Sequence, residues 1–303
     1  MCPGQGAQKV GMGKDLAERF PAARHTFEAI DEALGVPLSR LMWEGPEDEL
    51  VRTHNTQPAI LAHSAAVFAV VRDRLGAVAA GAGHSLGEYS AYVAARSLSA
   101  PEAARLVRRR GELMYEAGTR RPGAMSAVLG LDPAGVITAC TEASGPDGVA
   151  VAANLNAPDQ VVISGDPAAV TRAGDACKAR GAKRVLPLKV SGAFHSPLMA
   201  PAVAGLEAAL AAAPFADPAF PVVANASAEP VRTASAAVGL LAAQLTAPVR
   251  WIECMQAAAA LAPGATFIEL GPGSVLSGLL RKILPGARSL TLGTAAEVEA
   301  FLA

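Results

Sequence analysis

The sequence lacks the features that would suit it to bind nucleic acid, cross a membrane or hold a structural metal. Its 26 Lys and Arg residues are balanced by 27 Asp and Glu residues, so it has no cationic surplus for a phosphate backbone. No apolar run approaches the roughly 18 residues of a membrane helix; Val67–Val71, for example, is followed directly by Arg72. The four cysteines lie far apart without a CxxC pair, which favours a reduced compartment and argues against a zinc site.

Targeting and nucleotide-binding signals are also missing. The N-terminal residues Met1-Cys2-Pro3-Gly4 include no basic patch and no apolar h-region, so nothing marks the chain for secretion. The GxG tripeptides that begin at Gly4 and Gly81 lack the third glycine of GxGxxG, and no GxxxxGK[ST] occurs. We therefore expect a soluble, cytoplasmic protein that binds neither nucleic acid nor a membrane and has no nucleotide loop.

What the sequence does contain is an alternation of short apolar runs with helical stretches. Val78–Gly81, Val222–Asn225 and Thr266–Leu270 are typical of strands, and each precedes a segment compatible with a helix. Such alternation predicts an α/β fold with a largely parallel sheet. The 303 residues suffice for one large domain or two modest ones.

One internal segment follows a different order. Its predicted elements are, in turn, a strand, a helix, two strands, a helix and a strand: Ala124–Leu129, Pro133–Ala143, Val149–Asn154, Gln160–Ser164, Pro167–Arg180 and Lys183–Lys189. The order βαββαβ is that of ferredoxin-like folds. We interpret residues 121–191 as a small subdomain inserted into a body formed by residues 1–120 and 192–303.

The strongest chemical signal is a GxSxG motif, Gly83-His84-Ser85-Leu86-Gly87. It lies between a predicted strand and a predicted helix, as a nucleophile elbow requires, and its glycines permit a tight turn. A serine there sits at a helix N-terminus, where free N–H groups stabilise negative charge. We predict that Ser85 is a nucleophile; a glycine-rich turn with a serine N-cap is the alternative.

A serine nucleophile needs a base, and His195 is the best candidate among five histidines. It follows the last subdomain strand, where the chain returns to the body. His25 and His63 fall in helical patterns and are expected to lie on the surface or to pack, and His84 is expected to pack inside. No acid between Ser85 and His195 lies at a strand end of the body, so a backbone carbonyl could orient the histidine instead of the usual carboxylate.

Arg110 is the most informative single residue. The predicted helix Glu102–Ala117 has a capping box formed by Ser99 and Glu102, and Arg110 lies within its apolar stripe. A buried guanidinium must be paired. Its partner would be either a carboxylate of the protein or a substrate carboxylate held by two hydrogen bonds. The second possibility, combined with Ser85, indicates acyl transfer from a substrate that carries a free carboxylate.

These residues occur within a larger set of motifs that spans the chain. Over essentially its whole length, the sequence resembles the malonyl-CoA:acyl carrier protein transacylases of bacterial fatty-acid synthesis and the acyltransferase domains of polyketide synthases. The matching motifs are Pro3-Gly4-Gln5-Gly6, Thr56-Gln57-Pro58-Ala59, Gly83–Ser90, Arg110-Gly111, Asn154–Gly165, Gly192–Met199, Pro248-Val249-Arg250-Trp251 and Glu269-Leu270-Gly271-Pro272-Gly273.

The resemblance implies an α/β-hydrolase-like body with an inserted ferredoxin-like subdomain. It also implies roles for particular residues: Ser85 carries the malonyl group, His195 is general base and acid, and Arg110 binds the malonyl carboxylate. The N–H groups of Gln5 and Leu86 would form the oxyanion hole, and a backbone carbonyl near Arg250 would orient the histidine. The partners would be malonyl-CoA and a phosphopantetheinylated acyl carrier protein, and the enzyme would be a monomer without cofactor or metal.

The sequence departs from the family pattern at two places, and one further residue bears on acyl-group specificity. The family has a full strand before the Pro-Gly-Gln-Gly turn, whereas only Met1-Cys2 precede it here. We expect a missing or shortened central strand, and hypothesise an upstream start or a fragment, with Gln5 loosely held. Arg250 stands where some members have glutamine. Phe194 resembles the malonyl-selecting pattern, in which a bulky side chain excludes a methyl branch at a discrimination of about 1–3 kcal/mol.

Two other functions remain open from the sequence. A hydrolase would release the acyl group to water, although the buried Arg110 and the missing triad acid speak against it. A non-catalytic homologue that binds a carrier protein is the other alternative, against which the intact Ser85, His195 and Arg110 argue.

Overall fold

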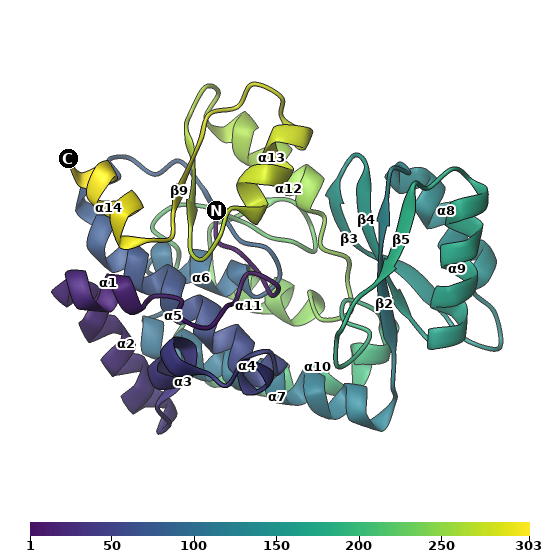
Figure 1. Cartoon of the computed structure of the whole chain (residues 1–303), viewed down its shortest axis with the longest axis horizontal. Helices are drawn as coiled ribbons and strands as arrows, with labels where there is room; N and C mark the ends of the chain where they lie inside the picture. Colours follow the sequence, from purple (N-terminus) through teal and green to yellow (C-terminus); the bar gives the residue numbers. More distant parts are fainter.

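The computed structural model describes residues 1–303 and shows a mixed α/β body with a smaller sheet-and-helix unit beside it (Figure 1). The α-helices are α1 Lys14–Arg19, α2 Pro21–Leu34, α3 Leu38–Glu44, α4 Glu47–Leu50, α5 Thr53–Val71, α6 Gly87–Ala94, α7 Ala100–Arg120, α8 Pro133–Ala143, α9 Pro167–Ala179, α10 Ala200–Ala212, α11 Ala234–Ala243, α12 Trp251–Leu261, α13 Val275–Ile283 and α14 Ala295–Leu302. The strands are β1 Gly81–Ala82, β2 Ala124–Leu129, β3 Ala150–Ala157, β4 Gln160–Gly165, β5 Arg184–Pro187, β6 Val222–Val223, β7 Pro230–Val231, β8 Phe267–Leu270 and β9 Ser289–Leu292. Two 3₁₀ turns, Arg72–Arg74 and Pro197–Met199, complete the list.

The sheet of the body is held together by the first two residues of the chain. On one side lie β1, β6 and β7, with β1 and β6 parallel; on the other lie the parallel strands β8 and β9. Met1 exchanges hydrogen bonds with β8, through Ile268 O at 2.6 Å and Leu270 N at 2.8 Å. Cys2 N donates to Ala82 O at 2.9 Å, which joins the two halves. Met1 and Cys2 therefore occupy the central position of this sheet.

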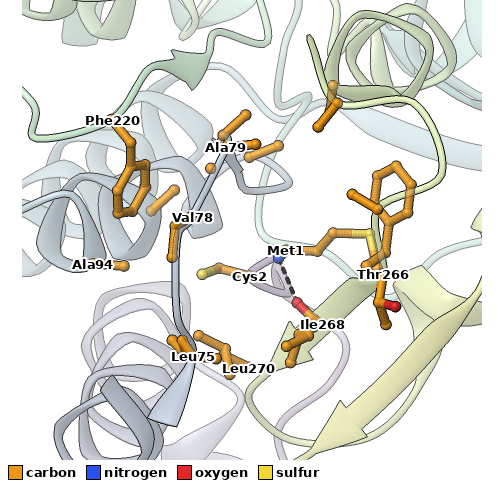
Figure 2. A pocket seen from close by; sticks show the side chains of 18 of the residues that line it. Met1, Cys2, Leu75, Val78, Ala79, Ala94, Phe220, Thr266, Ile268 and Leu270 are labelled. Atoms are coloured by element: carbon orange, nitrogen blue, oxygen red, sulfur yellow. Dashed lines mark hydrogen bonds between the residues drawn. The ribbon is translucent and has the colours of Figure 1, made fainter. Parts of the chain in front are cut away.

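An apolar cleft of about 310 Å³ continues from this dipeptide between the two halves of the sheet (Figure 2). Val78 and Ala79 line one side, Thr266 and Ile268 line the other, and Met1 lies between them. The backbone of residues 78–80 makes no hydrogen bond. The predicted strand Val78–Gly81 is therefore wrong in its bounds, because only its last residue has a partner strand, β6, and β1 is reduced to two residues.

The smaller unit has the predicted order. Its sheet runs β3-β4-β2-β5 with antiparallel neighbours, and α8 and α9 cover the face that points away from the body (Figure 1). A separate core of apolar side chains lies between these helices and the sheet. The edge strand β3 bonds to the body, since Leu155 N donates to Val249 O and Val249 N donates to Ala153 O. The domain bounds at residues 121 and 191 stay a prediction.

The long helices of the body pack in its centre. Helix α5 is buried on nearly every side, polar residues included, and therefore has no amphipathic pattern. Helix α7 is strongly amphipathic and begins at Ser99 with the predicted capping box to Glu102. None of the helices is both long and apolar enough to span a membrane.

Candidate active site

Ser85 lies on a tight turn between β1 and α6 and has a backbone φ of 52°. That left-handed conformation is uncommon for residues other than glycine. The two glycines of the motif are sterically required: a Cβ on Gly83 would lie 1.9 Å from Gly87 backbone atoms, and one on Gly87 would lie 2.2 Å from Cys2 O. Asn225 Oδ1 accepts the Ser85 N–H at 2.7 Å and stabilises the turn. The predicted nucleophile-elbow geometry is confirmed.

His195 contacts this serine directly. The distance from its Nε2 to Ser85 Oγ is 2.7 Å, and its Nδ1 lies 2.9 Å from the backbone carbonyl of Gln244. A carbonyl can only accept, so Nδ1 carries the proton and Nε2 is free to take one from the serine. Burial and the nearby Arg110 guanidinium lower the pKa of His195 to about 3. The imidazole is therefore neutral at neutral pH, as a general base must be.

The carbonyl that orients His195 is not that of Arg250, so this prediction is wrong. Arg250 precedes α12, and its carbonyl accepts the N–H of Cys254 in the first turn of that helix. Gln244 instead follows the last residue of α11. The carbonyls at a helix C-terminus have no partner within the helix, which leaves that of Gln244 free for the imidazole. The Arg250 side chain bonds to Glu253 and to the Ser227 carbonyl.

Arg110 is 1% exposed and lies next to Ser85. Its Nη2 is 3.2 Å from Ser85 Oγ and 2.9 Å from Gln244 Oε1, and its Nη1 is 2.7 Å from Gln57 Oε1. Its guanidinium also lies 5.8 Å from the centre of the Tyr89 ring, within range of a cation–π interaction. No carboxylate of the protein forms an ion pair with it, and its hydrogen bonds go to neutral side chains.

The Gln5 loop lies directly against the serine turn. A Cβ on Gly4 would lie 2.5 Å from the backbone oxygen of His84, so only glycine permits this approach. Neither the Gln5 N–H nor the Leu86 N–H donates a hydrogen bond within the protein. The Gln5 side chain is held, because its Oε1 accepts the Thr53 hydroxyl at 3.0 Å. These two free N–H groups flank the turn that carries Ser85.

The structure also places the other residues that the sequence analysis discussed. Phe194 is buried and directly precedes His195, whose φ is 55°. His84 packs edge-on against Trp251 and bonds to Asn156, and His63 is buried against the Gly293 carbonyl. His25 is exposed on α2. No group of three or more His, Cys, Asp or Glu side chains is arranged to hold a metal ion.

Sequence reasoning assigned no role to four polar residues that surround the site. These are Gln57, Glu88, Asn225 and Gln244, all buried. A usable signal existed for Gln244, which is the one polar side chain in the run Leu240-Leu241-Ala242-Ala243-Gln244-Leu245. A polar group in such a run is buried only where it finds hydrogen-bond partners.

Comparison with known proteins agrees with this geometry. Residues 1–295 match the family model described as acyl transferase domain. The chain belongs to this family. Among curated proteins, it is 44% identical to the malonyl CoA-acyl carrier protein transacylase of Bacillus subtilis strain 168, over 93% of this chain and 88% of the relative.

Two solved structures of acyl transferase relatives superpose on nearly the whole chain. An acyl carrier protein S-malonyltransferase from Vibrio cholerae has a TM-score of 0.94 at 41% identity, over 98% of this chain and 97% of the other. A malonyl-transacylase in complex with its type II polyketide acyl-carrier protein has a TM-score of 0.93 at 42% identity, over 99% and 97%. The expected fold class, a hydrolase-like body with a ferredoxin-like unit, is confirmed by these likenesses.

Proposed function

We propose that this acyl transferase moves a malonyl group from coenzyme A to the phosphopantetheine thiol of an acyl carrier protein, for fatty-acid or polyketide synthesis. The observation that carries the proposal is the position of Arg110, a buried cation without a carboxylate partner, 3.2 Å from Ser85 Oγ. The names of the relatives, a malonyl CoA-acyl carrier protein transacylase and a malonyl-transacylase bound to a polyketide acyl-carrier protein, agree with it.

In the first half-reaction, Ser85 Oγ attacks the thioester carbonyl of malonyl-CoA while His195 Nε2 takes the hydroxyl proton. The Gln5 and Leu86 N–H groups stabilise the oxyanion of the tetrahedral intermediate. The C–S bond then breaks, and the imidazolium returns its proton to the leaving thiolate of coenzyme A. The product is a malonyl ester on Ser85.

The second half-reaction is the reverse with another thiol. The phosphopantetheine thiol of the carrier protein gives its proton to His195 Nε2 and attacks the ester carbonyl. The C–O bond breaks, and Ser85 Oγ recovers the proton. Because a thioester is exchanged for a thioester, the reaction needs no further energy source, no metal and no cofactor.

Arg110 selects the acyl group by its charge and its position. The malonyl carboxylate is only two carbon–carbon bonds from the carbonyl that Ser85 attacks, so a guanidinium beside the serine matches a short diacid. Two parallel hydrogen bonds from the guanidinium would hold the carboxylate in a fixed orientation. The bulk of Phe194, next to His195, would disfavour a methyl-branched acyl group.

Hydrolysis is the main alternative, with water in place of the carrier thiol. The orientation of His195 by a backbone carbonyl does not exclude hydrolysis, since a neutral imidazole can also activate water. The deciding quantity is the lifetime of the malonyl ester in water compared with its lifetime in the presence of the carrier protein. We expect a monomeric enzyme.

The experiment is intact-protein mass spectrometry after mixing with malonyl-CoA, with Ser85→Ala as the control. A malonyl adduct on the parent alone, discharged by a phosphopantetheinylated carrier protein, supports the transferase. An adduct that decays equally fast without the carrier supports the hydrolase. A folded parent that forms no adduct supports the non-catalytic alternative.

A further inference from the structure

A buried carboxylate lies directly beneath the site. Glu88, in the first turn of α6, is fully buried and three residues from Ser85. Its Oε2 accepts the Asn225 backbone N–H at 2.9 Å and the Gln244 Nε2 at 2.7 Å. Its Oε1 has no partner, and no Lys, Arg or His side chain forms an ion pair with it. Burial of a carboxylate without an ion-pair partner costs free energy, which indicates a role other than helix packing.

Gln244 links this carboxylate to the reactive residues. Its side-chain nitrogen donates to Glu88 and to the Ser85 carbonyl, the latter at 3.1 Å, while its Oε1 accepts from Arg110. Its backbone carbonyl holds His195. One residue therefore contacts the residues with proposed roles as nucleophile, base and carboxylate-binding cation.

The orientation of the Gln244 amide decides whether these contacts are favourable. An amide rotated by 180° would present its NH₂ to Arg110, donor against donor. On the opposite side, Glu88 Oε2 can only accept, because a backbone N–H from Asn225 already points at it. A rotated amide would place an oxygen against that oxygen. Glu88 thus permits only the orientation that Arg110 requires.

On the basis of the function proposed above, we propose that Glu88 is a positioning residue. It fixes the Gln244 amide, and through it the Arg110 guanidinium, in the geometry that receives the substrate carboxylate. The Glu88 oxygens do not contact Ser85 Oγ or His195, so the carboxylate acts through Gln244 and not on the substrate. Burial raises the pKa of Glu88 to about 7, and a proton on the unpartnered Oε1 would leave the accepting Oε2 unchanged.

Two substitutions distinguish the contribution of the accepting oxygen from the contribution of the side-chain volume. In Glu88→Gln, the Asn225 N–H would attract the amide oxygen to the Oε2 position, and the acceptor for Gln244 would be kept. In Glu88→Met, the volume is kept but both oxygens are lost. Ser90→Ala is the matched control: its hydroxyl is also buried in α6 and has no hydrogen-bond partner.

The measurement is kcat and KM for transfer of malonyl and acetyl groups, with thermal unfolding as the test of folding. For Glu88→Met we expect the malonyl-to-acetyl ratio of kcat/KM to fall roughly tenfold to a hundredfold, the range for lost hydrogen bonds to a charged group. Most of the change should be in KM for malonyl-CoA. Glu88→Gln should restore the ratio to within about threefold of the parent, and Ser90→Ala should not change it.

A folded Glu88→Met enzyme with the parent ratio would overturn the proposal, as would Glu88→Gln with the same defect as Glu88→Met. Equal losses for both acyl groups would indicate a merely structural role and would also overturn it. If Glu88→Met does not fold, Gln244→Met takes its place, because it removes the same link and keeps the backbone carbonyl for His195. An unchanged ratio there overturns the proposal, and a lowered one supports it. Absence of a malonyl adduct on the parent would instead count against the function itself.

Discussion

Arg110 Nη2 and Ser85 Oγ lie 3.2 Å apart, a buried cation beside a serine hydroxyl without a carboxylate between them. Under the proposed function, this pair would set the size and charge of the acyl group that the site accepts. A short acyl chain with a terminal carboxylate would reach both residues at once, whereas a neutral chain would leave the guanidinium without a charged partner.

The first prediction concerns this cation. Arg110→Ala should lower kcat/KM for malonyl-CoA by about a hundredfold or more, because two charge-assisted hydrogen bonds are lost, and should affect acetyl-CoA much less. Arg109→Ala is the control, since Arg109 is exposed on the same helix and contacts Glu112. Equal losses for both donors would refute the proposed binding of the carboxylate.

The second prediction concerns the base. Burial and the Arg110 charge lower the pKa of His195 to about 3, so the rate of Ser85 acylation should show no inflection from this histidine between about pH 5 and 8. Rapid-quench mass spectrometry of the malonyl adduct would measure the rate. Burial raises the pKa of Glu88 to about 7, and the substitution Glu88→Gln removes the titration of this group from the pH profile. An inflection near pH 6.5 that persists in this variant would contradict the prediction.

The third prediction concerns a histidine outside the site. Burial lowers the pKa of His63 from 6.5 to about 4, so between these pH values the unfolded chain binds the proton and the folded protein does not. Stability should therefore fall as the pH falls through this range, by up to about 1.4 kcal/mol per unit for this residue. The slope should be shallower in His63→Gln, measured by urea unfolding at several pH values. Parallel curves would show that His63 is not responsible.

The fourth prediction concerns the cleft at Met1. An extension of four alternating or continuous apolar residues joined to Met1 should enter the space between Val78–Ala80 and Thr266–Ile268 and pair with both. Burial of apolar surface should raise the free energy of unfolding by about 1–3 kcal/mol. An extension of Ser and Gly of equal length is the control. Equal unfolding midpoints for the two proteins would refute this description of the cleft.

Much of the fold could be predicted from local patterns. The bounds Ala124–Leu129 and Pro133–Ala143 are correct to the residue, because Asp132 caps a helix that begins with proline. The bounds of the strand at Val78–Gly81 could not be placed, since a strand requires a partner and the apolar pattern does not show which of its residues are paired. Pairing is a tertiary property that a short run does not contain.

The site residues also divide into those that local sequence patterns reveal and those that they do not. Ser85 and Arg110 could be found because each breaks a local rule, a serine between two glycines and a charge within an apolar stripe. The carbonyl of Gln244 could not be found, since every residue has a carbonyl and only the position of the α11 C-terminus makes this one available. Arg250, six residues later, has its carbonyl engaged by the following helix.

The dipeptide Met1-Cys2 also supports the turn that carries the nucleophile. Cys2 O accepts the His84 N–H at 3.0 Å and lies where a side chain on Gly87 would have to go. The dipeptide and Ser85 are thus coupled through a few backbone atoms. A substitution in this dipeptide that moves its backbone would therefore move the Ser85 turn as well, although neither side chain belongs to the proposed site.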